Sequence, residues 1–303
     1  MGRLLLACWF GFLLPFQSDP LTDAKKALQS RDLEAALRLF QEAARQDSGN
    51  GEAHYYLALL YSRKGLERET AGHFVRALEL LPDEEVIWSE YGKWLLGQRY
   101  LTEAERVYRH LARTHPGKRA YWISLGQALY ERGRPVQALE SYKRGLGLGR
   151  PEPLDYYLAG LAARSLARLD EAREDFRKGL ALQPGHQELN YQMAELLLQT
   201  GALKESLAHW ERLGDESGRG RYGRGVALMR LGRPDEAEGH LSQALRLIPD
   251  ESRVHYQLGV LYARSGRKEQ SDRFFERFRE LEQAEREKKK TRVSKSLVKD
   301  PGE

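Results

Sequence analysis

The sequence predicts an all-α fold, a right-handed solenoid of about seven to eight helix–turn–helix units. The first observation is a regular spacing of prolines: Pro82 and Pro116 lie one interval apart, and Pro116 and Pro184 lie two. The second is composition, because Ala, Leu, Glu, Arg and Gln favour helices and runs of β-branched residues are missing. A period of about 34 residues indicates stacked modules that share one continuous core.

Residues 51–84 show the plan of one unit. Apolar and small side chains recur at helical spacing, and Gly65 follows as a residue that tolerates the positive φ of a helix C-terminus. A second apolar stripe comes next, and Pro82 blocks its continuation. The two stripes comprise His54, Leu57, Ala58 and Tyr61, then Phe74, Ala77, Leu78 and Leu81. Each unit is therefore expected to be two helices joined by a turn.

The same plan divides the chain into units near residues 21–50, 51–84, 85–118, 119–152, 153–186, 187–217, 218–251 and 252–283. The first unit matches only in its second half, which suits a capping unit. The unit at 187–217 is three residues short, so we expect a local bend or a change of pitch there. The last unit has Ser271 where others have Ala, and it runs into a charged helix that we expect to cover the last apolar face.

These units resemble the tetratricopeptide repeat, in which Trp, Leu-Gly and Tyr are followed by Ala, Phe, Ala and Pro. Small residues recur where the two helices of a unit would approach closely, since bulky ones would overpack the contact. They are Gly92, Gly126, Gly160, Gly225 and Gly259 in first helices, and Ala104, Ala138, Ala172 and Ala237 in second helices. The resemblance covers roughly residues 21–283, and the chain resembles exported bacterial members of the family. It implies a scaffold or adaptor that binds other proteins.

The resemblance also implies that the fifth, ninth, twelfth and thirteenth residues of each unit line a concave groove. Tyr and Arg recur at these places, and they are residue types that concentrate binding energy at interfaces. The predicted partner-binding residues are Tyr55, Arg63, Tyr157, Arg164, Tyr191, Tyr222, Arg230, Tyr256 and Arg264. Such a groove would hold an extended or helical peptide of a client that carries acidic groups. The alternative is that the tyrosines pack between units.

The positive charge of the chain is concentrated in its tail. The net charge is +5, and residues 286–299 alone hold seven Lys or Arg and one Glu. Residues 19–285 sum to zero, which argues against a nucleic-acid-binding body. A basic tail over 284–303 is expected to be solvated, and weak contact with an anionic membrane or nucleic acid through this tail is the alternative function. The oligomeric state is not predicted.

The N-terminal residues 1–18 are expected to form a signal peptide, or an apolar leader that is not cleaved. Arg3 precedes an apolar run over 4–16 and a polar stretch, and this order and length are typical of a secretory signal. The chain is therefore expected to be exported, into the periplasm or outside the cell. Cys8 is the only cysteine, and it comes too early in the apolar run for lipoprotein anchoring to be expected.

No motif predicts an enzyme, and no catalytic, cofactor-binding or metal-binding residues are expected. Residues 218–223 fit a dinucleotide-binding pattern by letters, but they begin a helical unit where that motif needs a preceding strand. The eight histidines do not form the paired spacing with a carboxylate that a zinc hydrolase needs. Because no nucleophile, base and orienting group can be assembled from spacing, a binding role is favoured.

Overall fold

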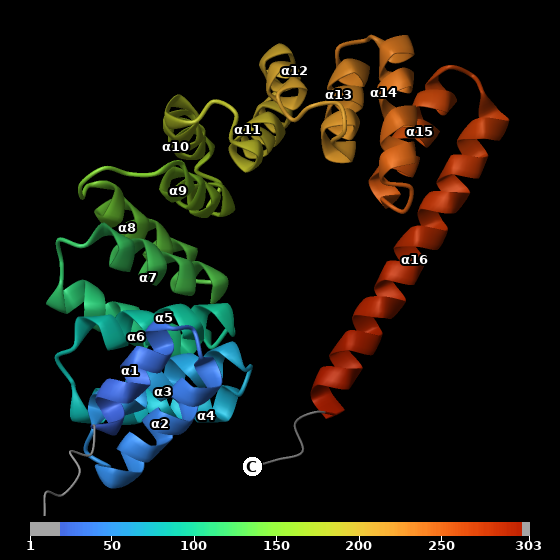
Figure 1. Ribbon diagram of the computed structural model, residues 1–303. Helices are drawn as coiled ribbons and strands as arrows, with labels where there is room; N and C mark the ends of the chain where they lie inside the picture. Colours follow the sequence, from blue (N-terminus) through green and yellow to red (C-terminus); the bar gives the residue numbers. More distant parts are fainter. Residues whose placement is uncertain (1–18, 299–303) are drawn as a thin grey trace, which may run out of the picture. The chain divides into compact units, whose positions relative to one another are not determined.

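The computed structural model describes residues 19–298 as helices and short connections, with side chains described as far as Thr291. Sixteen helices and no strands occur in this part of the chain, which confirms the predicted all-α repeat fold (Figure 1). The helices form consecutive pairs, and the first member of each pair is called here the A helix and the second the B helix. The apolar leader and the last five residues of the tail lie outside the described residues.

The helices fall into two compact units, residues 1–116 and 117–303, called here unit 1 and unit 2. Unit 1 contains α1 (Pro20–Gln29), α2 (Leu33–Gln46), α3 (Gly51–Arg63), α4 (Glu67–Leu80), α5 (Glu85–Gly97) and α6 (Leu101–Thr114). Unit 2 contains α7 (Arg119–Glu131), α8 (Pro135–Leu146), α9 (Pro153–Ser165), α10 (Leu169–Leu182), α11 (Gln187–Thr200), α12 (Leu203–Glu211), α13 (Gly218–Arg230), α14 (Pro234–Leu247), α15 (Ser252–Arg264) and α16 (Lys268–Val298).

Each pair is held together by a small A-helix residue that faces a large B-helix residue sixteen positions later. A Cβ atom added to Gly126 would lie 2.5 Å from the ring of Tyr142, and one added to Gly259 would lie 2.9 Å from the ring of Phe275. The helices therefore approach more closely than a larger residue would allow. The small and large partners are Ala24 and Phe40, Ala58 and Phe74, Gly92 and Tyr108, Gly126 and Tyr142, Gly160 and Phe176, Ala194 and Trp210, Gly225 and Leu241, and Gly259 and Phe275.

The turn between the two helices of each pair contains one residue in the left-handed backbone region. Its position advances by one repeat period along most of the described chain, and by three residues less across the short unit. These residues are Arg31, Gly65, Arg99, Gly133, Ala167, Gly201, Gly232 and Gly266. The glycines were identifiable from the sequence. The other three positions were not, because Ala167 (φ 57°), for example, adopts a conformation that costs a Cβ-bearing residue energy.

In the shortened repeat at residues 187–217, an arginine from the next helix bonds to the end of the B helix. Its B helix, α12, has only nine residues, and the side chain of Trp210 near its end is fully buried. Arg224 of α13, which is 6% exposed, donates to the carbonyl oxygens of Glu211 (3.0 Å) and Gly214 (3.2 Å). Its guanidinium also pairs with the Asp215 carboxylate at 2.7 Å. Arg224 thereby adds hydrogen bonds at the end of α12, where the Gly214 N–H also donates to the Glu211 carbonyl at 3.2 Å.

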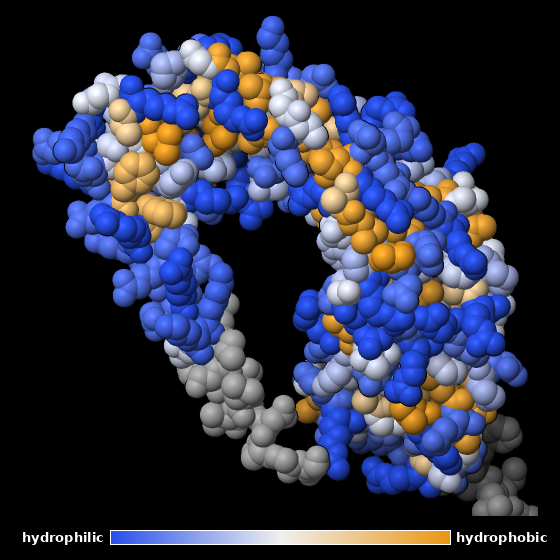
Figure 2. Space-filling view, turned by 180° about the vertical axis from the view of Figure 1, so that it is seen from behind, coloured by the Kyte–Doolittle hydropathy of each residue, from blue (hydrophilic) through white to orange (hydrophobic). Residues whose placement is uncertain are grey.

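The last helix begins as an ordinary B helix and then continues far beyond its partner. Phe274, Phe275 and Phe278 of α16 lie against aromatic residues of α15, and the Ser271 hydroxyl donates to the Gly259 carbonyl at 2.9 Å. No break separates this part from the predicted tail, because α16 continues to Val298. Residues 284–291 are exposed, and Figure 2 shows a hydrophilic surface along this stretch. Within 19–298, no helix combines the length and apolar character that a membrane span requires.

We expect Ala167→Gly to raise the free energy of unfolding by about 0.5–1 kcal/mol, since glycine adopts the left-handed conformation without steric cost. Gly133→Ala, at the same turn position in unit 2, is the matched opposite change and should lower it by about 1 kcal/mol. Urea unfolding followed by circular dichroism measures both. Shifts of the same sign in the two variants would show that backbone conformation does not govern these turns.

Candidate functional site

The A helices α9, α11, α13 and α15 of unit 2 carry a set of tyrosines, arginines and one carboxylate, called here the A-helix face. Its members are Tyr157 and Arg164 on α9, Tyr191 and Glu195 on α11, Arg219 and Tyr222 on α13, and Arg253 on α15. The guanidinium of Arg219 lies 5.6 Å from the ring centre of Tyr191, and that of Arg253 lies 5.3 Å from the ring centre of Tyr222. Each arginine thus covers the tyrosine of the preceding A helix in a cation–π contact.

Glu195 is half-buried at the centre of this face. Burial raises the pKa of its carboxyl group, and the positive charges of Arg253 and Arg164 act in the opposite direction. Burial also raises the pKa of Tyr222, Glu195 adds to that rise, and Arg253 opposes it. The phenol of Tyr222 therefore stays protonated at neutral pH and can donate a hydrogen bond.

Tyr157 and Arg253 complete the electrostatic pattern. Burial raises the pKa of Tyr157, as does the charge of Glu188, while Arg164 lowers it. A hydrogen bond to Glu251, at 2.7 Å, raises the pKa of Arg253. The face therefore combines fixed cations with neutral phenols, a pairing suited to carboxylates and peptide carbonyls.

The structure brings together four of the residues predicted from sequence, Tyr157, Arg164, Tyr191 and Tyr222. Tyr256, which is 44% exposed, instead packs against Phe275 and Phe278 of α16, with ring centres at 5.8 and 5.4 Å. The remaining predicted residues lie apart from this cluster: Arg230 donates to the Leu198 carbonyl, Arg264 is exposed near the end of α15, and Tyr55 and Arg63 belong to α3 in unit 1.

Sequence reasoning missed Arg219 and Arg253. Each is the second residue of its helix–turn–helix repeat, and the two lie one repeat period apart. This position is not among those that the family resemblance implied. Their recurrence at one register position was the available signal. Glu195 stood at one of the implied groove positions but was not among the predicted partner-binding residues.

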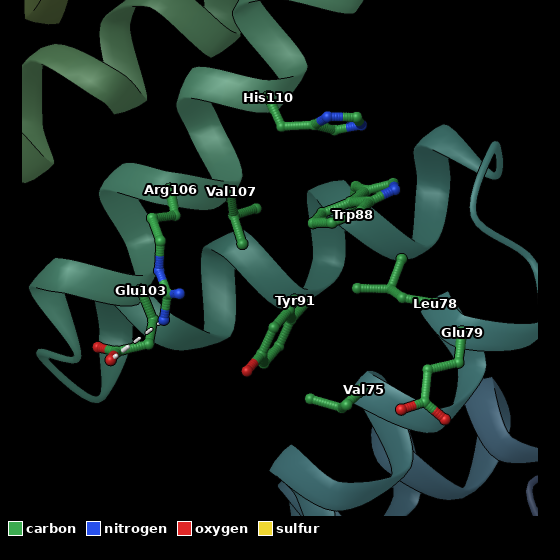
Figure 3. Close-up of a pocket in the computed structure, with 9 residues that line it drawn as sticks. All are labelled: Val75, Leu78, Glu79, Trp88, Tyr91, Glu103, Arg106, Val107 and His110. Atoms are coloured by element: carbon green, nitrogen blue, oxygen red, sulfur yellow. Dashed lines mark ion pairs between the residues drawn. The ribbon is translucent and has the colours of Figure 1, made fainter.

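Unit 1 contains a different feature, a cavity that is lined by aromatic residues of α5 and by side chains of α4 and α6. One part, of about 450 Å³, is shown in Figure 3, where Trp88 and Tyr91 project between Val75 of α4 and Val107 of α6. A second part, of about 460 Å³, shares Tyr91 with the first and is also lined by Trp94. The density of aromatic residues over 88–100 was the available signal for this cavity.

A hydrogen bond and ring contacts hold the aromatic rings of this cavity in place. The Trp88 indole nitrogen donates to the Pro82 carbonyl at 2.7 Å, and its ring centre lies 4.3 Å from that of His110. The Tyr91 and Trp94 rings stack at 6.1 Å. This surface can accommodate apolar side chains, although the aromatic residues also serve to pack α5 against its neighbours.

A pair of histidines joins α3 to α4 in unit 1. The Nδ1 atoms of His54 and His73 lie 2.9 Å apart, so one ring must donate and the other must accept with a deprotonated nitrogen. Burial lowers the pKa of both, Arg76 lowers that of His54 further, and Glu69 opposes the shift at His73. At the same register in unit 2, His209 Nδ1 meets the Asn190 side-chain oxygen at 2.9 Å. The described residues hold no group of three side chains that could bind a metal ion.

Eight helix pairs with turns at a constant register define a helical repeat protein with an exposed side-chain face. Models of the tetratricopeptide repeat match residues 21–84, 92–153 and 222–279, and a second model of this repeat matches residues 163–223. The first model alone covers more than half of the chain. The chain therefore belongs to the tetratricopeptide repeat family.

Among curated proteins, the chain is similar to human protein O-mannosyl-transferase TMTC3, with 22% identity over 260 residues. That alignment covers 78% of this chain and 28% of the relative, so the chain spans little more than a quarter of the length of the protein it matches.

Two solved structures show the same fold. The protein MamA of Desulfovibrio magneticus RS-1 is 24% identical, with a TM-score of 0.51 over 55% of this chain and 96% of MamA. YrrB, described as a TPR protein with an unusual peptide-binding site, is 17% identical, with a TM-score of 0.53 over 60% of this chain and 95% of YrrB.

We expect the chain to lose stability as the pH falls below about 6.5, because the folded state favours the neutral histidine pair and protonating both rings breaks their hydrogen bond. The loss should be on the order of 1 kcal/mol after solvent screening. His54→Asn copies the Asn190–His209 pair, keeps the hydrogen bond when His73 is protonated, and should remove this part of the loss. Urea midpoints at pH 7.5 and 5.5 measure it; equal losses in the variant and the parent chain would contradict the assignment.

Proposed function

We propose that the chain is a protein-interaction scaffold that binds a peptide or helix of a client protein on the A-helix face of unit 2. One observation carries the proposal: Tyr191 and Tyr222 are each held by an arginine of the next repeat, which leaves a fixed, partly exposed surface of phenols and guanidinium groups. Rigid tyrosine and arginine side chains give binding energy at low entropic cost. The peptide-binding site named for YrrB supports a peptide as one form of client.

The client is expected to carry acidic groups. Arg164, Arg219 and Arg253 contribute three positive charges to the face, whereas Glu195 contributes one negative charge at its centre. Arginine guanidinium groups bind carboxylates through two parallel hydrogen bonds, which favours Asp and Glu side chains or a C-terminal carboxylate. Glu195 would then select against clients that place a carboxylate at the middle of the face.

A non-catalytic role is part of the proposal. The matched relative is named as a mannosyl-transferase, but the chain corresponds to little more than a quarter of it. The titratable groups gathered on the A-helix face are arginines, tyrosines and one carboxylate on helix surfaces, and this set lacks an activated nucleophile. We assign the chain a binding role and no transferase activity of its own.

The site of action is proposed to lie outside the cytoplasm, in the periplasm or the extracellular space. The proposal depends on the apolar run at residues 4–16, which precedes the described residues. Cell fractionation of the full chain tests it, and retention of an uncleaved chain in the cytoplasm would overturn export.

Affinity capture from the source organism tests the client-binding function. A chain tagged after Glu303 should recover one or a few proteins after mild cross-linking, and Arg164→Ala combined with Arg219→Ala should reduce that recovery about tenfold. Arg173→Ala combined with Arg246→Ala removes equal charge from exposed B-helix positions of the same unit and serves as the control. Equal recovery with both double variants would refute the A-helix face as the binding surface.

A second candidate function, binding to an anionic membrane or a nucleic acid, is favoured by the exposed end of α16. Residues 284–291 are exposed on a continuous helix, and the stretch from Arg286 to Lys299 is strongly basic.

If α16 has this second function, deletion of residues 286–303 should abolish sedimentation with phosphatidylserine vesicles or retention on polynucleotide. Raising the salt from 50 to 300 mM should weaken such binding strongly, because it depends on long-range charge. Binding that survives the deletion would exclude the tail as its cause.

A further inference from the structure

The same pattern of four side chains occurs on two consecutive A helices, α13 and α15. Each helix carries Arg, Tyr, Val and Arg at offsets of zero, three, seven and eleven, and the two patterns are one repeat period apart. These offsets return to one face of a helix. The members are Arg219, Tyr222, Val226 and Arg230 on α13, and Arg253, Tyr256, Val260 and Arg264 on α15. This set is called here the double stripe.

The double stripe is accessible to a partner. All four of its arginines and Tyr256 are exposed, and Tyr222, Val226 and Val260 are half-buried. Because α13 and α15 lie side by side in unit 2, equivalent residues form four rows across the two helices: arginine, tyrosine, valine and arginine. The surface therefore has a middle of tyrosine and valine with a basic edge on each side, and the Arg253 guanidinium of one edge lies over the Tyr222 ring.

Several of these side chains are held in place by the fold. Arg253 stacks over Tyr222 at 5.3 Å and pairs with Glu251 at 2.7 Å. Arg219 stacks over Tyr191, and Arg230 donates to the Leu198 carbonyl. Tyr256 lies against Phe275 and Phe278. A partner therefore meets a surface that is already ordered, which reduces the entropy lost on binding.

The width of the double stripe favours a helix over an extended chain. Eleven residues of α-helix rise about 16 Å, which separates the two arginine rows. A helix about 10–12 Å in diameter fits between these rows and can reach both with side chains on its two flanks. Strands lie about 4.8 Å from their neighbours, so an extended peptide would leave one row unused.

We infer that the double stripe binds an amphipathic helix of the client whose apolar face is bordered by acidic residues on both sides. The inference rests on the proposed function and adds the form and charge pattern of the bound segment. The apolar rows receive the apolar face, and each arginine row pairs with one acidic edge.

The neighbouring helix limits where the acidic part of the partner can lie. At the equivalent positions, α11 carries Glu188, Tyr191, Glu195 and Gln199 in place of the basic stripe. Acidic residues over α11 would be repelled, so the acidic stretch spans two A helices, or about 16–20 Å at the usual helix spacing. Neutral or basic residues are expected where the partner continues over α11.

Two synthetic peptides, each a helix of about four turns, test the inference on the full chain by fluorescence anisotropy. Both peptides have the same composition and the same apolar stripe. The first has glutamates along both edges of that stripe. In the second, the glutamates of one edge are moved to the face of the helix opposite the stripe. We expect the two-edge peptide to bind at least about tenfold more tightly. Arg219→Gln combined with Arg264→Gln should abolish this preference, whereas Arg173→Gln combined with Arg246→Gln should leave it unchanged.

Equal affinities for the two peptides, or the absence of binding by both, would overturn the inference. If affinity capture still recovers a client that depends on Arg164 and Arg219, the proposed function stands and only the helical, two-edged form of its ligand is wrong. If capture also fails to depend on these arginines, the proposed function fails with it. A preference that persists in the Arg219 and Arg264 variant would place the binding site elsewhere.

Discussion

Close contact between the two helices of each pair is the constraint on which the rest of the structure depends. A Gly or Ala on the A helix meets a large side chain sixteen positions later on the B helix, in every pair of the described chain. This contact sets the separation of the helices and therefore the length of turn that can join them. The left-handed turn residue and the alignment of successive A helices are consistent with this separation. Side chains on the A helices can then recur in rows.

Much of the helix-pair architecture could be predicted from local features of the sequence. Prolines, small residues and turn glycines were enough to predict helix pairs, since each has a local cause. The turns at Arg31, Arg99 and Ala167 carry no such mark, because the surrounding pair imposes a conformation that these residues do not favour alone. Arg224 was equally hidden, since its role depends on the end of a helix in the preceding repeat.

The A-helix face was predicted less completely, because contacts between repeats determine which side chains form it. The positions implied by the family resemblance placed Tyr157, Tyr191 and Tyr222 on this face, yet Arg219 and Arg253 reach back over the preceding repeat from other positions. Tyr256 has the same register but a different neighbour, because α16 supplies Phe275 and Phe278 beside it. Equivalent residues can therefore differ in the side chains that surround them, because the next helix in the chain supplies those neighbours.

The contacts of Arg224 connect two adjacent repeats. In an array of independent modules, a boundary between repeats can open without loss inside either module. Here the end of α12 obtains hydrogen bonds from a side chain on α13, so opening that boundary would break these bonds and expose the buried Arg224 guanidinium to water. The repeat at residues 187–217 is three residues shorter than its neighbours, and a side chain of the following repeat bonds to its shortened end.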